Sequence, residues 1–314
     1  ASFELAKLYP AMPGSREGWQ YDWSYLSVQG DKLIGSAVKK GTAYTEFWGD
    51  ASAGWYDATS GPATFKVCSE NLFALDQQTG RKMWRYTGGM IINSTISIAG
   101  DRIFFLESRH PKVKASDSHR IGMPELWQDQ YLVALDLAQG SQVWEKLVKP
   151  AAGEVVVYLA CGQGKLVLVT SGDKKYHVYA FDGVGGNPLW QSQFPWDKDN
   201  PGAHMARPAI VGHNVYVRPK VFDLLTGQVR AETIPGGGCG TYAATDKALF
   251  FRNSNVTVWD VENGQTTSWE RLRPDCWLST IPADGLLLSP EAGGGCSCGS
   301  WMETSLAFIP KNRE

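Results

Sequence analysis

Short apolar runs alternate with polar turns along most of the chain, and one such arrangement occurs five times. In the first copy, "LFALDQQTGRKMWRY" (72–86), an apolar run ends in Asp76, a polar turn reaches Gly80, and a second run carries Trp84. Runs of four to eight mainly apolar residues bounded by Gly, Asn or Asp are typical of β-strands. A short turn that contains Gly joins two such strands into a hairpin. The pattern therefore predicts a β-hairpin in each copy.

The copies recur at a spacing that identifies a repeat architecture. The repeated aspartates are Asp76, Asp136, Asp182, Asp223 and Asp260, separated by 60, 46, 41 and 37 residues. A second strand pair with a tight turn precedes each copy, at 27–36, 97–106, 159–169, 209–217 and 243–251. Four antiparallel strands repeated at this period predict a β-propeller, in which each repeat forms one blade.

The number of blades depends on how the two ends of the chain are assigned. A sixth unit begins at Cys276 and has three strands, and "FELAKLYP" (3–10) is similar to "VWEKLVKP" (143–150), the fourth strand of the second unit. We therefore expect one all-β propeller domain over 1–314 with six blades, in which the strand 3–10 completes the last blade. The alternative is the C-terminal part of a propeller with seven or eight blades.

The repeated Asp and Trp residues have a structural explanation. A single four-stranded sheet cannot bury both of its faces, so neighbouring blades must pack on each other. The aspartate ends the third strand, and the tryptophan lies on the outer strand, where it can reach the next blade. The residues expected to dock blades in this way are Asp76, Trp84, Asp136, Trp144, Asp182, Trp190, Asp260 and Trp269.

The pattern "ALD-x-x-TG-x-x-x-W" resembles the repeat of pyrroloquinoline-quinone (PQQ) type propellers. That family includes quinoprotein alcohol dehydrogenases and the scaffold lipoprotein of bacterial outer-membrane protein assembly. The resemblance covers nearly the whole chain, is strongest at Asp76 and Asp136, and is weakest at Asp223, whose copy has no Trp. The run 273–311 is similar to exported PQQ-like repeat proteins of planctomycete-type bacteria. The resemblance implies a bacterial protein exported to the periplasm or cell surface.

One face of the predicted propeller carries the long connections. Connections between the second and third strands of a blade, and between blades, emerge on the face opposite the short hairpin turns. Two of them, 39–65 and 108–130, are long, and long loops on a rigid scaffold are where binding usually occurs. Residues at or just before the first strand of a blade face the axis on this side. The ligand-binding candidates are therefore Asn93, His204, Arg207 and Trp277.

Four cysteines are expected on the same face, namely Cys239, Cys276, Cys296 and Cys298. Because the family resemblance implies export, disulfides are the favoured interpretation. A zinc or copper site and free thiols are the alternatives. The sequence contains no C-x-x-C-H motif, so covalent c-type haem is not expected.

Composition and motifs argue against several classes of function. The formal net charge is −2 and no basic block occurs, which argues against a nucleic-acid surface. No apolar run is long enough for a membrane span. The chain has no G-x-S-x-G, H-E-x-x-H or phosphate-loop motif, so no catalytic residue is assigned. We therefore expect a non-enzymatic scaffold that binds a protein partner, such as an outer-membrane complex. The alternative is a quinoprotein-like redox subunit that binds PQQ or a metal at the channel mouth, with a cytochrome partner.

Overall fold

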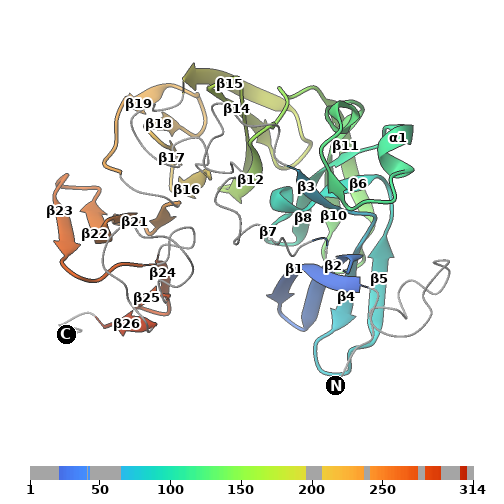
Figure 1. Cartoon of the computed structure of the whole chain (residues 1–314), viewed down its shortest axis with the longest axis horizontal. Helices are drawn as coiled ribbons and strands as arrows, with labels where there is room; N and C mark the ends of the chain where they lie inside the picture. Colours follow the sequence, from blue (N-terminus) through green and yellow to red (C-terminus); the bar gives the residue numbers. More distant parts are fainter. Residues whose placement is uncertain are drawn as a thin grey trace, which may run out of the picture.

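Antiparallel sheets, most of them with four strands, follow one another around an arc (Figure 1). The computed structural model describes residues 21–40, 42, 65–195, 207–236, 241–274, 280–290 and 305–309. The first blade is a sheet in the order β1-β2-β4-β5, so the strands run outward in chain order. Their bounds are β1 (Tyr21–Gln29), β2 (Lys32–Lys39), β4 (Leu72–Asp76) and β5 (Lys82–Tyr86).

Blades 3 to 5 repeat this order along the chain, and blade 2 repeats it within a larger sheet of seven strands. Blade 2 contains β7 (Ser97–Ala99), β8 (Arg102–Ser108), β10 (Gln130–Asp136) and β11 (Gln142–Val148). Blade 3 contains β12 (Val156–Gly162), β13 (Lys165–Gly172), β14 (Lys175–Asp182) and β15 (Pro188–Pro195). Blade 4 contains β16 (Ala209–Val211), β17 (Asn214–Val217), β18 (Lys220–Asp223) and β19 (Val229–Ala231). Blade 5 contains β20 (Ala243–Ala244), β21 (Ala248–Asn253), β22 (Asn255–Asp260) and β23 (Thr266–Trp269).

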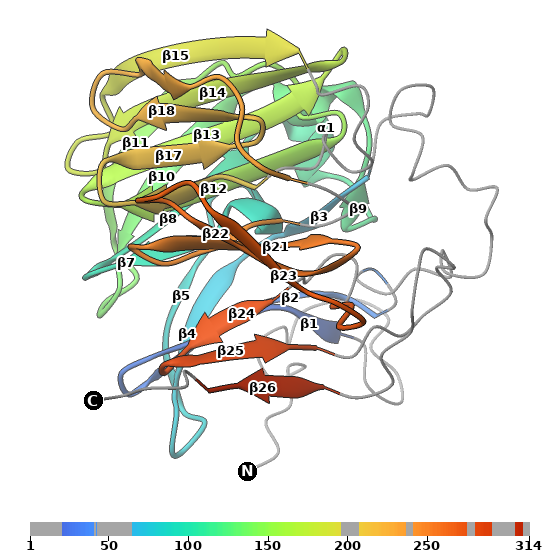
Figure 2. The same cartoon turned by 90° about the vertical axis from the view of Figure 1, so that its left-hand side faces the viewer.

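The prediction of an all-β propeller with four-stranded antiparallel blades is confirmed, whereas the described residues form five such blades and not the predicted six. Five blades have four strands, and the last sheet has three, namely β24 (Ile281–Ala283), β25 (Leu286–Ser289) and β26 (Leu306–Phe308). Figure 2 shows this sheet next to blade 5. The fourth strand of the sixth blade was assigned to 3–10, which lies outside the described residues.

The apolar core is divided among the boundaries between blades. One cluster joins Leu106 and Leu132 of blade 2 to Leu159 and Leu168 of blade 3, and all four side chains are buried. Similar clusters join blades 1 and 2, blades 3 and 4, and blades 4 and 5. Each sheet therefore buries its faces against its neighbours, which is why single blades cannot fold alone.

The repeated aspartate organises the hairpin turn between the third and fourth strands. In blade 1, Asp76 Oδ1 accepts hydrogen bonds from the Gln78 and Thr79 amides at 3.2 and 2.7 Å. Gly80 has a φ of 69° and donates its N–H to the Asp76 carbonyl oxygen at 2.8 Å. Because this left-handed conformation favours glycine, the turn requires both ends of the D-x-x-T-G pattern.

Each repeat tryptophan in blades 1 to 3 packs on the turn of the following blade. Trp84, Trp144 and Trp190 donate their indole N–H to the carbonyl oxygens of Leu137, Gly183 and Leu224 at 3.1, 3.2 and 2.8 Å. A Cβ atom on Gly140 would lie 2.4 Å from the Trp84 ring. The same crowding occurs at 2.6 Å between Gly186 and Trp144 and between Gly227 and Trp190. The indole of the preceding blade therefore packs directly on the turn glycine, which leaves no room for a side chain at that position.

Blade 4 lacks this contact because Ala231 occupies the tryptophan position. In agreement, a Cβ atom on Gly264 of blade 5 would meet no atom within 4 Å. In blade 5 the tryptophan is Trp269, nine residues after Asp260 rather than eight, and it stacks on Phe308 of the three-stranded sheet with ring centroids 5.7 Å apart. The energetic role of the repeat Asp and Trp residues in docking stays a prediction, which stability measurements test.

The outer edge of β26 has no partner strand among the described residues, and the segment 3–10 stays the predicted one. A largely apolar cavity of about 490 Å³ lies beside this sheet, lined in part by Trp269, Leu287, Phe308 and Ile309. Unpaired edges promote aggregation. Deletion of residues 1–10 is therefore expected to lower the melting temperature and to cause aggregation in light-scattering chromatography. Deletion of 311–314 is the control, and equal behaviour of the two truncations would exclude 3–10 as the closing strand.

Candidate binding site on the long-loop face

The structure describes two of the four predicted ligand-binding residues. Asn93 begins the 3₁₀ turn η3 (Asn93–Thr95), and its side-chain N–H₂ donates to the Ser24 hydroxyl of blade 1. The Arg207 guanidinium lies over the Tyr158 ring of blade 3, 4.7 Å from the ring centroid. His204 and Trp277 lie outside the described residues. The structure thus places Asn93 and Arg207 against different blades, and a shared ligand for them stays a prediction.

The four cysteines predicted to form disulfides all lie outside the described residues, namely Cys239, Cys276, Cys296 and Cys298. Two other cysteines are described, and both are free thiols: Cys68 is buried and Cys161 is half-buried. Burial raises the pKa of the Cys161 thiol to about 11. The described ranges contain no group of three or more His, Cys, Asp or Glu side chains suited to a metal ion. Within the same ranges, no helix has the length and apolar character needed to cross a membrane.

The two long connections meet at the boundary between blades 1 and 2. The connection between β8 and β10 folds into α1 (Pro111–Lys114), β9 (Arg120–Ile121) and η4 (Pro124–Trp127). The end of the connection in blade 1 forms β3 (Lys66–Ser69), which pairs with β9 and with β6 (Met90–Ile92). β6 in turn pairs with β8, so the sheet of blade 2 continues onto the long-loop face. This extension positions the residues of the site.

His119 holds together the two ends of the long connection in blade 1. Its ring is fully buried, Nδ1 accepts the Lys39 N–H at 3.0 Å, and Nε2 lies 3.2 Å from Glu70 Oε1. Because Nδ1 accepts, the neutral ring carries its proton on Nε2 and donates it to Glu70. This hydrogen bond lowers the pKa of the Glu70 carboxyl, against the effect of partial burial. Glu70 is therefore a fixed carboxylate at the surface.

A buried carboxylate fixes the backbone between β5 and β6. Glu107 is fully buried and accepts hydrogen bonds from the Tyr86 hydroxyl at 3.0 Å, the Gly89 N–H at 2.9 Å and Arg109 Nε at 2.7 Å. Arg109 also pairs with Glu145 at 2.5 Å and lies over the Tyr131 ring. Burial, followed by the negative charge of Glu107, raises the pKa of Tyr86. Because both carboxylate oxygens of the buried Glu107 accept hydrogen bonds, this network holds Tyr86 and Gly89 in place.

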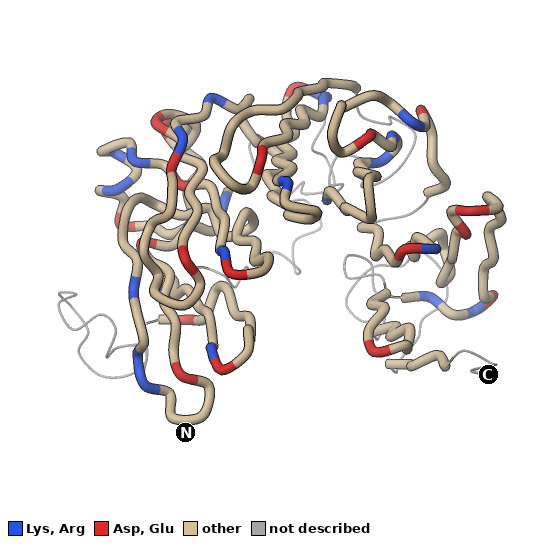
Figure 3. The backbone as a smooth tube through the Cα atoms, turned by 180° about the vertical axis from the view of Figure 1, so that it is seen from behind, with Lys and Arg blue, Asp and Glu red and all other residues tan. Residues whose placement is uncertain are grey.

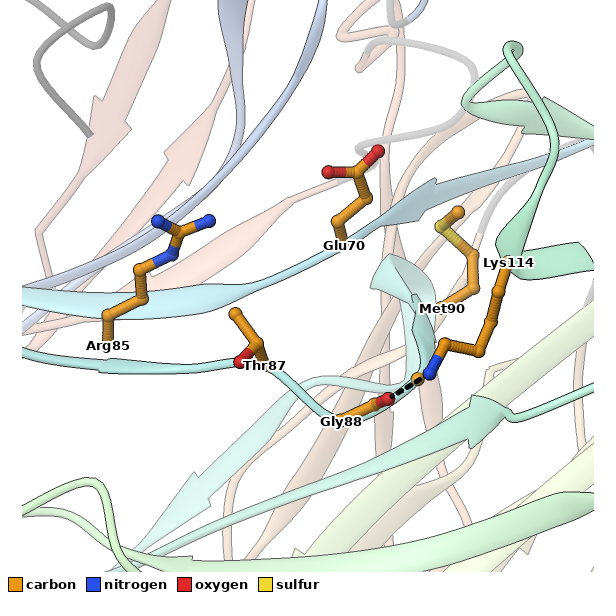
Figure 4. Close-up of a pocket in the computed structure, with 7 residues that line it drawn as sticks. Glu70, Arg85, Thr87, Gly88, Met90 and Lys114 are labelled. Atoms are coloured by element: carbon orange, nitrogen blue, oxygen red, sulfur yellow. Dashed lines mark hydrogen bonds between the residues drawn. The ribbon is translucent and has the colours of Figure 1, made fainter. Parts of the chain in front are cut away.

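A pocket of about 300 Å³ lies between α1, Glu70 after β3, and the segment from β5 to β6 (Figure 4). Arg85 and Lys114 lie at opposite ends, with Glu70 and Thr87 between them. The Lys114 ammonium donates to the Gly88 carbonyl oxygen at 3.1 Å. Together the lining residues, namely Glu70, Arg85, Thr87, Gly88, Gly89, Met90 and Lys114, offer two cations, one carboxylate and one hydroxyl. The pocket can therefore bind a small polar group by hydrogen bonds and charge.

Of the two connections predicted to carry the site, 108–130 contributes Lys114 to the pocket, and none of the pocket residues was predicted. Two signals in the sequence point to them. The segment 109–120 concentrates basic and histidine residues, and the pair Gly88–Gly89 stands at the junction of blades 1 and 2. A Cβ atom on Gly89 would lie 2.6 Å from the Ser108 carbonyl oxygen, so close backbone approach requires this glycine.

The sheet order, the repeated turn and the stacked tryptophans define a β-propeller of PQQ-type repeats. A family model described as "Outer membrane protein assembly factor BamB" matches residues 17–271, which is most of the chain. The chain belongs to this family of PQQ-like repeat proteins. No curated protein gives a significant match to the sequence.

Solved structures are similar at low sequence identity. BamB from Moraxella catarrhalis is 12% identical, with 91% of this chain and 88% of that chain covered and a TM-score of 0.45. A chain of the mitotic checkpoint complex is 10% identical, with 87% and 72% covered and a TM-score of 0.50. The quinohemoprotein alcohol dehydrogenase from Comamonas testosteroni is 13% identical, with 78% and 42% covered and a TM-score of 0.44. At these identities the similarity concerns the fold alone.

Proposed function

We propose that this protein is a non-enzymatic scaffold that binds a partner protein on the long-loop face of blades 1 and 2. The observation that carries the proposal is the pairing of β3, from the end of the first long connection, with β9 of the second and with β6, next to a pocket lined by residues of blade 1 and by Lys114 of the second connection. A propeller needs neither connection to close its blades, and ordered loops on a rigid scaffold are typical of binding surfaces.

The polar groups of this surface are held in place before any partner arrives. His119 fixes Glu70, and Glu107 fixes the chain from Tyr86 to Gly89. A preformed surface loses little conformational entropy when it binds, which favours recognition of a partner. Location in the periplasm or at the cell surface, and an outer-membrane complex as the partner, complete the proposal. Both rest on the family, whose model is described as an assembly factor.

Photo-crosslinking in the organism's own cells tests whether a partner binds on the long-loop face. A photoreactive amino acid at Thr87, on the rim of the pocket, is expected to give crosslinks to a partner protein. The control position is Val184, which is 86% exposed on the hairpin turn of blade 3, at the opposite face. Crosslinks from Val184 alone, or from neither position, would contradict the proposal.

A further inference from the structure

We infer that the pocket between blades 1 and 2 recognises a carboxylate group of its partner, which either an acidic side chain or a chain terminus can supply. This inference rests on the proposed function. It concerns the chemistry of the group that enters the pocket formed by Glu70, Arg85, Thr87, Gly88, Gly89, Met90 and Lys114.

Lys114 is the central residue because no carboxylate of the described residues pairs with its ammonium. Within the part of the chain that the structure describes, its ammonium has one hydrogen bond, to the uncharged carbonyl oxygen of Gly88. Figure 3 shows basic residues on the loop that carries α1. Two nearby lysines are each paired with an acidic side chain: Lys112 with Glu125 at 2.7 Å, and Lys39 with Asp117 at 3.7 Å. Lys114 can therefore form a new ion pair without losing one.

The negative charge already in the pocket belongs to other groups. The Glu70 carboxylate is bonded to His119, and the nearby charges of Lys39 and Arg85 further lower its pKa. With Arg85 and Lys114 both cationic, the lining keeps an excess of positive charge. A carboxylate placed beside Lys114 would gain a charge-assisted hydrogen bond, the stronger class of hydrogen bond in proteins.

The remaining lining groups suit a carboxylate on a short aliphatic stem. The Thr87 hydroxyl can donate a second hydrogen bond, and the Met90 side chain offers an apolar contact for methylene groups (Figure 4). A dianionic phosphate fits less well, because the Glu70 carboxylate shares the same wall and like charges repel.

Fluorescence anisotropy with three labelled Gly/Ser-rich octapeptides tests the inference. The first has one internal Glu and an amidated end, the second has Gln in place of Glu, and the third has Gln with a free carboxyl terminus. We expect the first or the third to bind at least about tenfold more tightly than the second, because a hydrogen bond to a charged group is worth about 1.5–3 kcal/mol. The peptide that binds identifies the source of the carboxylate.

Two variants on the same helix link this preference to one residue. Lys114→Gln is expected to remove the tenfold preference, whereas Lys112→Gln, whose lysine pairs with Glu125 outside the pocket lining, should keep it. Both side chains are exposed, so neither change should alter the circular dichroism spectrum. Equal binding of the three peptides, absence of binding, or equal effects of the two variants would overturn the carboxylate inference. Crosslinks from Thr87 would still support the scaffold role.

Discussion

Replacement of Trp84 by alanine is expected to lower the free energy of unfolding by about 3–5 kcal/mol, the range found for loss of a buried tryptophan. The indole is 8% exposed, seats on Gly140 of blade 2 and donates a hydrogen bond to the Leu137 carbonyl oxygen. Its loss leaves a cavity at the boundary between blades 1 and 2. Guanidinium denaturation followed by circular dichroism measures the change. Trp269→Ala, which removes an indole that is 36% exposed, should have a smaller effect.

A pair of glycine substitutions separates the indole contact from backbone strain. Gly140 and Gly264 have φ values of 67° and 70°, so alanine strains the backbone similarly at both. Only at Gly140 does the added Cβ atom collide with a tryptophan. Gly140→Ala is therefore expected to be more destabilising than Gly264→Ala by about 1–3 kcal/mol, the usual effect of overpacking. Equal losses would show that the indole does not dock the blades.

A second large effect is expected from pH, through Lys66. Its side chain is buried, and the ammonium donates to the carbonyl oxygens of Glu154 and Val155 at 3.0 and 3.2 Å. Burial lowers the pKa of Lys66 from 10.5 to about 7, although Cys68 and Glu154 oppose the shift. Above the folded-state pKa, the unfolded chain holds a proton that the folded chain has released. Stability should therefore rise with pH, by up to about 1.4 kcal/mol per pH unit.

The effect of Lys66 is best measured between about pH 7 and 8.5, because cysteines act in the opposite direction at higher pH. Burial raises the pKa of Cys68 from 9.0 to about 12, so its contribution to stability is lost as the pH rises above 9. Denaturation of the wild type in this window should show the rise. Lys66→Met, which keeps the aliphatic stem, should abolish it. A variant with the same pH dependence as the wild type would rule out Lys66 as its source.

The parts of the fold that were predicted correctly depend on short-range interactions. Asp76 bonds to the amides two and three residues further on, and Gly80 closes the same turn, so the pattern is visible within nine residues. The copy at Asp223 matches the repeat least well because it lacks Trp. In the structure, Gly264 of the next blade accordingly has no indole packed on it.

The site escaped prediction because its residues are brought together over long stretches of chain. His119 contacts Lys39 and Glu70, 80 and 49 residues away. β3, β6 and β9 have only two to four residues each, so pairing with partner strands, rather than local propensity, makes them strands. The sequence pattern could indicate which connections are long, but not which side chains converge.

The alanine at position 231 has a mechanical consequence. Blades 1 to 4 are joined in series by indoles seated on glycines, whereas the joint between blades 4 and 5 has no such anchor. We therefore expect the arc to be stiff from blade 1 to blade 4 and to bend most easily after blade 4. A partner bound to blades 1 and 2 would contact the stiff segment, while the C-terminal blades could move without changing the binding surface.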